Sequence, residues 1–255
     1  MKDEVNPINA EVVQKLRQYA AEYETAHFLE GDPSWFMHQV KGTENQEAMA
    51  FIASALSYGR RSQFMEKLRQ VLAWTGGDVD GWVREGHYTE HFLCDDAHCF
   101  YRLHTHGAMH SFLCAYRELL QECGTLGRYL RAEATDGLEA VSAICRWFAS
   151  HSPESGVIPR DTQSACKRVC MFLRWMVRSG SPVDLGLWAD FIDRRTLIMP
   201  LDTHVLQQSV RLGLLNSKTA TMSTARRLTE ALATIFPDDP LRGDFALFGY
   251  GVTHD

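Results

Sequence analysis

The sequence has no apolar run long enough to cross a membrane, and it has no charged and apolar leader at its N-terminus. We therefore expect a cytoplasmic protein with no membrane partner. It also lacks any Cys-x-x-Cys pair, and its 7 cysteines are an odd number. The absence of such a pair argues against a zinc ribbon and against a four-cysteine iron–sulfur cluster. In a cytoplasmic protein, an odd number of scattered cysteines predicts reduced thiols.

Basic residues are also not in excess over acidic ones. The 26 Lys and Arg residues are outnumbered by 32 Asp and Glu residues, which gives a net charge of −6 and a pI near 6.0. Domains whose whole surface binds nucleic acid are usually basic, so the composition argues against that class. A local basic cleft stays open, because affinity depends on where the cations lie.

The chain contains no alternating β-branched run that would predict a strand, and no internal repeat. Apolar residues instead recur at helical spacing almost throughout. We expect an all-α protein, a single domain over residues 1–255, built as a two-lobed helical bundle with a cleft between lobes 1–150 and 151–255. The predicted helices cover about 12–23, 43–55, 64–72, 109–120, 138–148, 162–178, 181–192, 202–213, 225–235 and a last segment from Asp239.

One window gathers histidines and cysteines between Cys94 and His110. Such side chains are zinc ligands, and His104 and His106 would line up on an extended segment. No standard ligand spacing is met, however, so we expect no metal site and no cofactor. A metal-dependent enzyme built on this window is the weakest of three functional hypotheses.

The segment CKRVCMFLRWMVR predicts an amphipathic helix whose basic face carries Lys167, Arg174 and Arg178. One interpretation is a solvated face. The other is that the face lines a cleft, where the arginines meet phosphates and their field lowers the pKa of Lys167 toward a reactive amine. Two interpretations are likewise open for Arg60 and Arg61. They could contact phosphates at the mouth of a cleft, or they could lie at a helix C-terminus, where positive charge complements the helix dipole.

Asp202 follows Pro200 and precedes a helical run, so it lies at or beside a helix N-cap. The helix terminus favours the ionised carboxylate, and a carboxylate that is reliably ionised can stabilise positive charge in a transition state. Structural capping and catalysis are therefore both compatible with this position. An amine nucleophile such as Lys167 and a carboxylate are the minimum set for cutting a base from a nucleic acid.

The segment PLDTHVLQQSVRLGLL resembles the part of helix-hairpin-helix (HhH-GPD) DNA glycosylases that carries a hydrophobic-Asp-Thr-His-Val core followed by Arg-Leu-Gly. The separation between Lys167 and Asp202 is most similar to that in archaeal 8-oxoguanine DNA glycosylase, which has an extra helix where residues 181–192 lie here. The DFALF segment from Asp244 to Phe248 resembles the pattern with which that branch contacts the extruded base. Together with FLRWMVR and VDLGLW, the chain also resembles an uncharacterised bacterial family of unknown-function domain proteins.

The resemblance implies base excision from duplex DNA with a damaged base, by a glycosylase and AP lyase that acts on an oxidised base. Lys167 would form the Schiff base and Asp202 would stabilise the sugar cation. Asp244 would bond the base edge and Phe248 would stack on it. We also expect Arg174 and His204 to bind substrate, and no obligate protein partner is evident.

One feature of the superfamily is missing from this sequence. The residues before the lysine, SGVIPRDTQSACK, contain one glycine and no Gly-x-Gly, whereas the superfamily's hairpin binds a DNA phosphate through a glycine-rich turn. The alternative is therefore a non-catalytic helical nucleic-acid-binding protein that keeps the fold without the chemistry.

Overall fold

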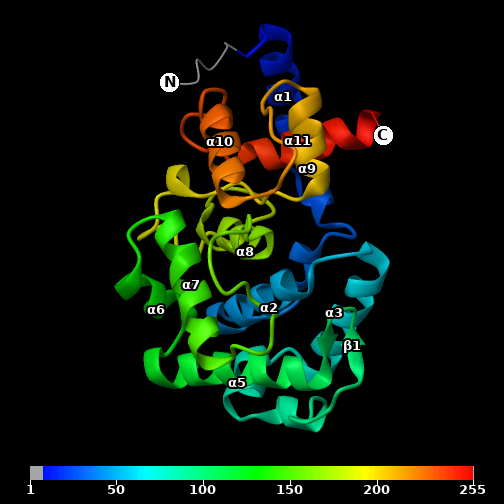
Figure 1. Cartoon of the computed structure of the whole chain (residues 1–255), viewed down its shortest axis with the longest axis vertical. Helices are drawn as coiled ribbons and strands as arrows, with labels where there is room; N and C mark the ends of the chain where they lie inside the picture. The colour runs from blue at the N-terminus through cyan, green and yellow to red at the C-terminus, as the bar shows by residue number, and fades with distance from the viewer. Residues whose placement is uncertain (1–7, 255) are drawn as a thin grey trace.

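The computed structural model describes residues 8–254, so both ends of the predicted 1–255 domain lie outside the described residues. The prediction of an all-α protein is confirmed, since helices make up most of the described chain (Figure 1). The elements are α1 (Ala10–Tyr23), η1 (Ala26–Leu29), η2 (Pro33–His38), α2 (Thr43–Leu56), α3 (Arg61–Thr75), α4 (Val79–Arg84), η3 (His87–Glu90), β1 (Cys99–Tyr101), β2 (His104–Thr105), α5 (His106–Cys123), α6 (Leu126–Glu133), α7 (Gly137–His151), α8 (Lys167–Val177), η4 (Arg194–Thr196), α9 (Thr203–Arg211), α10 (Met222–Ala233) and α11 (Arg242–His254).

The helices gather in two groups, with α8 between them. In Figure 1 the helices α2, α3, α5, α6 and α7 lie below α8, and α1, α9, α10 and α11 lie above it. Helix α1 packs along α11, which also packs on α9. The first helix therefore lies with the last helices of the chain, and the arrangement differs in this respect from the sequence division at residue 150.

Helix α2 forms the centre of the lower group, because nearly every residue from Glu47 to Leu56 is buried. The ring of Phe51 lies 5.0 to 5.6 Å, centre to centre, from four other aromatic rings. These rings come from α5, α7 and α8, so one side chain connects the helices around α2. Aromatic contacts of this kind bury large apolar areas and favour tilted geometries.

The helix predicted over residues 181–192 is absent, and that prediction was wrong. The chain there forms turns whose backbone N–H groups donate to the last turn of α8. Leu185 N bonds the Trp175 carbonyl at 2.7 Å, and Trp188 N bonds the Met176 carbonyl at 2.7 Å. A helix end leaves its last carbonyls without partners, and this returning segment satisfies them.

Helix α8 begins at Lys167, five residues after the predicted start at Thr162. Its N-cap, Cys166, has φ 46°, in the left-handed region that a β-carbon disfavours. The preceding residues form turns, and Ser164 forms an isolated β-bridge with Thr221. The lysine therefore occupies the first helical position.

A short antiparallel hairpin, β1–β2, lies between α4 and α5, where no strand was predicted. Its strands span residues 99–101 and 104–105, too short for the alternation that predicts strands from sequence. The turn that joins α2 to α3 contacts this hairpin, since Tyr58 Oη donates to the Tyr101 carbonyl at 3.1 Å and accepts from Leu103 N at 3.3 Å.

Glu47 gives the core a pH-dependent contact. Its carboxylate accepts hydrogen bonds from Leu126 N at 2.8 Å and Gly127 N at 3.1 Å, and so caps α6 from α2. Burial outweighs these bonds and raises the pKa of Glu47 to about 7. Folding therefore favours the protonated acid. This contribution to stability is complete below pH 4.5, the ordinary pKa, and is lost as the pH rises to about 7.

We expect Glu47→Gln to remove this dependence, because glutamine cannot ionise. The interval from 4.5 to about 7 corresponds to about 3 kcal/mol in the free energy of unfolding. Relative to wild type, the variant should therefore gain stability between pH 5 and pH 8, measured by urea unfolding at both values. Glu44→Gln, on the exposed first turn of the same helix, is the control. If the free energies of unfolding of wild type and variant differ by the same amount at pH 5 and at pH 8, Glu47 does not titrate in this range.

Candidate active site

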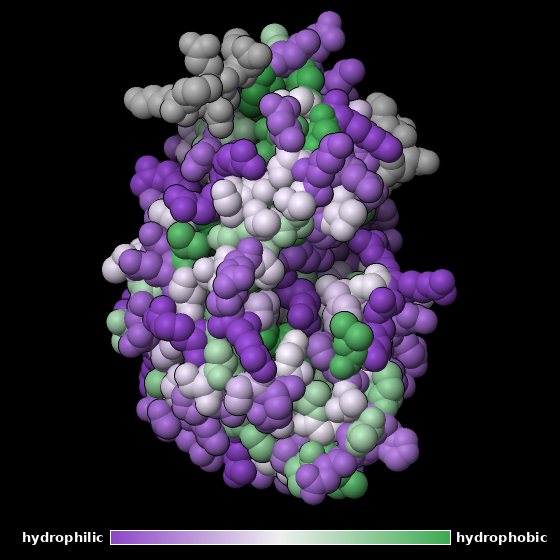
Figure 2. Space-filling view, in the orientation of Figure 1, coloured by the Kyte–Doolittle hydropathy of each residue, from purple (hydrophilic) through white to green (hydrophobic). Residues whose placement is uncertain are grey.

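All six residues predicted to act on substrate line one pocket of about 420 Å³. Figure 2 shows a hollow on the molecular surface between the upper and the lower group of helices. The residues that line the pocket come from α8, α9 and α11, together with Phe28 of η1 and Arg61 at the start of α3. The predicted residues are Lys167, Arg174, Asp202, His204, Asp244 and Phe248.

Lys167 and Asp202 face each other across the pocket. Lys167 Nζ lies 3.8 Å from Asp202 Oδ2, and their side chains are 30% and 42% exposed. Asp202 is the N-cap of α9, and its Oδ1 accepts a hydrogen bond from Val205 N at 2.9 Å. One carboxylate oxygen therefore holds the helix while the other faces the amine. Asp202 therefore caps α9 and contacts Lys167 at the same time.

The two arginines of the α8 basic face are buried, so the solvated interpretation is wrong for them. Arg174 is 3% exposed and Arg178 is 1% exposed. Arg174 Nε lies 3.2 Å from Asp184 Oδ1, and its Nη1 bonds Asp244. The other oxygen of Asp184 bonds Arg178 Nη1. Asp184 thus bridges two guanidinium groups that lie one helical turn apart.

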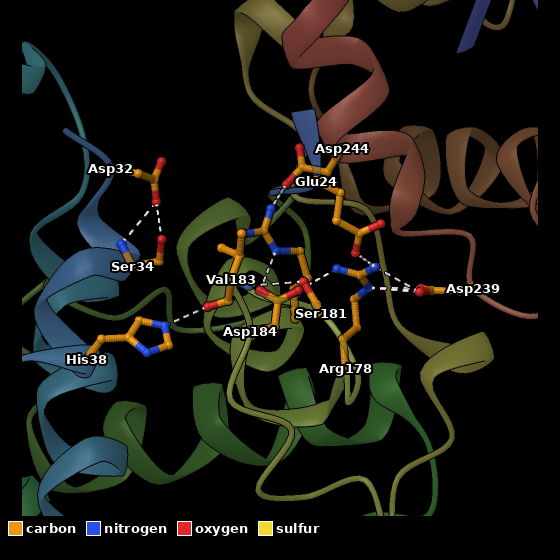
Figure 3. Close-up of polar contacts among 11 residues, drawn as sticks. Glu24, Asp32, Ser34, His38, Arg178, Ser181, Val183, Asp184, Asp239 and Asp244 are labelled. Carbon is orange, nitrogen blue, oxygen red and sulfur yellow. Dashed lines mark hydrogen bonds and ion pairs between the residues drawn. The ribbon is translucent and has the colours of Figure 1, made fainter. Parts of the chain in front are cut away.

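Further carboxylates surround Arg178. In Figure 3, Glu24, Asp184 and Asp239 converge on its guanidinium. Arg178 Nη2 lies 2.8 Å from Asp239 Oδ2 and 2.5 Å from Glu24 Oε1. Because Glu24 follows α1 and Asp239 precedes α11, the network ties both helices to α8. We call Glu24, Arg174, Arg178, Asp184, Asp239 and Asp244 the arginine network.

Asp244 lies where the arginine network meets the pocket. Burial raises the pKa of Asp244 above its ordinary value, although Arg174 and Lys167 favour its ionised form. A carboxyl group that keeps its proton more readily can donate a hydrogen bond as well as accept one. The position suits a group that recognises a polar ligand edge.

Aromatic residues form part of the pocket wall. The ring of Phe248 lies 4.9 Å from that of Phe28 and 5.7 Å from that of Tyr23, in edge-on geometries. The Arg61 guanidinium lies 6.0 Å from the Phe248 ring centre. Sequence reasoning missed Phe28, since no motif marks it. For Arg61 the structure favours the cleft mouth over a helix C-terminus, because the residue begins α3.

His204 and Asp32 complete the polar lining. His204 lies against α11, where a β-carbon added to Gly251 would be 2.8 Å from its Nε2. The glycine therefore permits the close approach of α9 and α11. Asp32, also missed from sequence, caps η2 through Ser34 N and lies 4.0 Å from Arg61.

Three histidines of the Cys94–His110 window pack against neighbouring segments, whereas His98 is exposed and pairs with Asp96. His106 Nδ1 pairs with the His91 carbonyl at 2.9 Å, and His110 Nδ1 pairs with the Phe92 carbonyl at 2.7 Å. His104 is buried beside Arg168. Within residues 8–254, no group of three or more His, Cys, Asp or Glu side chains is arranged to hold a metal ion. The same described part of the chain contains no helix long and apolar enough to span a membrane.

A larger hollow of about 760 Å³ lies beyond the arginine network, lined by Arg17, Arg194 and Arg242 among others. This hollow contains no lysine beside a carboxylate, so it lacks an amine nucleophile although it is larger. We therefore place the candidate site in the smaller pocket around Lys167.

We expect Asp184→Asn to destabilise the fold strongly, because it leaves two buried guanidinium groups with less compensating charge. Loss of one partner from a buried ion pair costs about 3 kcal/mol or more. Asp190→Asn, which breaks an exposed pair with Arg131, should leave the unfolding midpoint nearly unchanged. Urea unfolding of both variants makes the comparison. Equal midpoints for the two variants would show that the bridge does not stabilise the fold.

Comparison with known proteins assigns the chain to a family. No curated protein and no solved structure matches it significantly. Over residues 32–253, which include all six pocket residues named above, it matches the family described as "Protein of unknown function (DUF2400)", and the chain belongs to that family.

Proposed function

We propose that this protein is a DNA base-excision glycosylase with AP-lyase activity, which acts on an oxidised base through a lysine Schiff base. The observation that carries the proposal is the 3.8 Å approach of Lys167 Nζ to Asp202 Oδ2 within one pocket. A partly exposed amine beside a carboxylate, at the ends of two helices, is the minimum set for this chemistry.

In the proposed reaction, the neutral amine of Lys167 attacks C1′ of the damaged nucleotide. The glycosidic bond breaks, and its electron pair leaves with the base, which takes up a proton. Asp202 stabilises the positive charge that develops on the sugar and can accept the proton released by the amine. Ring opening gives an imine at C1′. Loss of a proton from C2′ then expels the 3′ phosphate and cuts the strand.

The base would lie between the aromatic residues of the pocket wall and Asp244. Phe248 offers a ring for stacking, and Asp244 offers a carboxyl group for the base edge. Arg174 is engaged by Asp184 and Asp244, so its role in this proposal is to hold Asp244 rather than to bind a phosphate. His204 provides a further polar contact on the rim of α9.

The proposal includes a fold of the helix-hairpin-helix glycosylase type, with two lobes on either side of the substrate cleft. It is supported by a pocket that residues of α8, α9 and α11 line together with residues of the earlier segments η1 and α3. Base flipping requires such a recess, because the target atoms are inaccessible inside a duplex.

A non-catalytic nucleic-acid-binding protein is the second candidate. It is favoured by the turn between α7 and α8, where Gly156, with φ 62°, is the one glycine. Such a turn offers fewer closely packed N–H groups to a phosphate than a glycine-rich hairpin does. This candidate would bind duplex DNA without forming a covalent adduct.

We expect borohydride to trap a covalent adduct between the wild-type protein and a duplex that contains an abasic site or 8-oxoguanine. Lys167→Ala should lower the yield on the order of 10³-fold or more, because the nucleophile is lost. Lys41→Ala, a change at an exposed lysine outside the pocket, is the control. A trapped adduct that persists in Lys167→Ala would disprove the lysine assignment.

Asp202→Asn separates catalysis from capping. Asparagine caps helices about as well as aspartate, so the melting temperature should stay close to that of wild type. The rate of base release should fall about 10²- to 10³-fold, because the charge that stabilises the sugar cation is removed. Trapping on a preformed abasic site should be affected less. Asp202→Ala should also lose about 1 kcal/mol of stability through the missing cap. Unchanged base release by Asp202→Asn would leave the residue as a cap alone.

A further inference from the structure

The large hollow of about 760 Å³ beyond the arginine network is lined by segments from distant parts of the chain. Arg17 of α1, Arg194 of η4 and Arg242 of α11 line it, together with the loop 235–239 between α10 and α11. Its volume is typical of small-molecule sites, which occupy roughly 300 to 1,000 Å³. The large hollow therefore has room for a ligand of its own.

Two of these arginines, Arg17 and Arg194, bond the same turn. Arg17 Nη2 donates to the Ile235 carbonyl at 3.4 Å, and Arg194 Nε donates to the Asp238 carbonyl at 2.9 Å. Ile235 and Asp238 are three positions apart, so their Cα atoms lie within about 11 Å of each other. A guanidinium group bonded to a neutral carbonyl keeps its charge and has further N–H donors, and within residues 8–254 neither arginine forms an ion pair with a carboxylate. The two cations are therefore held near each other with donors left for a ligand.

The carboxylates that line the large hollow are engaged by other arginines, with one exception. Glu24 accepts from Arg178 at 2.5 Å and from Arg242 at 2.9 Å. Asp239 accepts from Arg178 at 2.8 Å, as Figure 3 shows. Asp238 is exposed, and its carboxylate forms no hydrogen bond or ion pair with the part of the chain that the structure describes. Two guanidinium groups without an ion pair thus meet one such carboxylate, and positive charge is in excess.

An apolar surface lies beside these cations. Ile235, Phe236 and Pro237 line the large hollow, and Pro182 lines it from the segment after α8. The Arg242 guanidinium lies 5.7 Å from the Phe236 ring centre. Small-molecule sites combine such apolar surface with a few placed polar groups. The surface can therefore cover the carbon skeleton of an organic anion.

We propose that the large hollow binds an organic phosphate, with Arg17 and Arg194 on the phosphate group and Phe236 and Pro237 against the organic part. Guanidinium groups bind phosphate oxygens through paired N–H donors. A phosphate has more charge and more acceptor oxygens than a carboxylate, so it can bind two guanidinium groups at once. The inference does not depend on the proposed function, because Lys167 begins α8 and the large hollow lies at the other end of that helix.

The phosphate could belong to a free metabolite or to a nucleotide of a DNA strand. The test therefore titrates the full chain with inorganic phosphate, with dAMP and with an undamaged duplex, by calorimetry at constant ionic strength. dAMP should bind at least as tightly as inorganic phosphate. Arg17→Gln and Arg194→Gln should each weaken dAMP binding about 10-fold, because each removes a charge-assisted contact. Glutamine keeps a donor for the carbonyl, so the melting temperatures should stay close to that of wild type.

Arg195→Gln is the matched control, since Arg195 is the neighbour of Arg194 but pairs with Asp193 and does not line the large hollow. It should bind dAMP like wild type. Asp238→Asn should bind dAMP more tightly, because it removes an opposing charge next to the two arginines. Wild-type affinity in both Arg17→Gln and Arg194→Gln would overturn the inference. So would a wild-type protein that binds neither phosphate nor dAMP at millimolar concentrations.

The duplex separates the two sources of the phosphate. Duplex affinity that falls in Arg17→Gln and Arg194→Gln, together with dAMP affinity, supports a site for a strand. Duplex affinity that stays unchanged while dAMP affinity falls supports a site for a free organic phosphate. Borohydride trapping by Lys167 is measured separately, so its failure would leave these results in place.

Discussion

The buried bridge from Arg174 through Asp184 to Arg178 is the interaction on which the rest of the structure depends. Arg174 lies on α8, the helix that begins with Lys167, and Arg178 is the C-cap of that helix. Asp184 reaches them because the chain turns back after α8, and this return also supplies backbone donors to the end of the helix. Glu24 and Asp239 extend the bridge to α1 and α11. The position of Lys167 therefore depends on buried contacts that extend from the pocket to α1 and to the start of α11.

A network of this kind is an unusual way to hold a helix, because desolvation of buried charges offsets most of their attraction. A well-packed apolar contact would hold α8 as firmly. The arginine network differs from such a contact in one respect: its far end, Asp244, opens into the pocket with a pKa raised by burial. The network therefore places a carboxyl group of altered acidity beside Lys167 and fixes its orientation through Arg174.

Local sequence patterns predicted most of the longer helices and the cap at Asp202, because periodicity and capping depend on neighbouring residues, but they missed the short helices α4 and α6. They failed over residues 181–192, where a Ser-Pro start and apolar spacing resemble a helix but long-range bonds to α8 prevail. They also failed to distinguish a solvated face from a buried one at Arg174 and Arg178, because a helical wheel does not reveal the carboxylates that approach from other elements. Phe28 belongs to the pocket only through tertiary packing, so no motif marks it.

The acidic composition conflicts with the proposed binding of DNA only if charge is spread evenly over the protein surface. Here several of the carboxylates are used internally, since Glu24, Asp184, Asp239 and Asp244 face arginines in the core. Arg61 and Lys167, in contrast, line the pocket with partly exposed side chains. The field near a surface is set by the charges within about 10 Å, because salt screens more distant ones. A chain with a net charge of −6 can therefore still offer Arg61 and Lys167 to a phosphate backbone at the pocket.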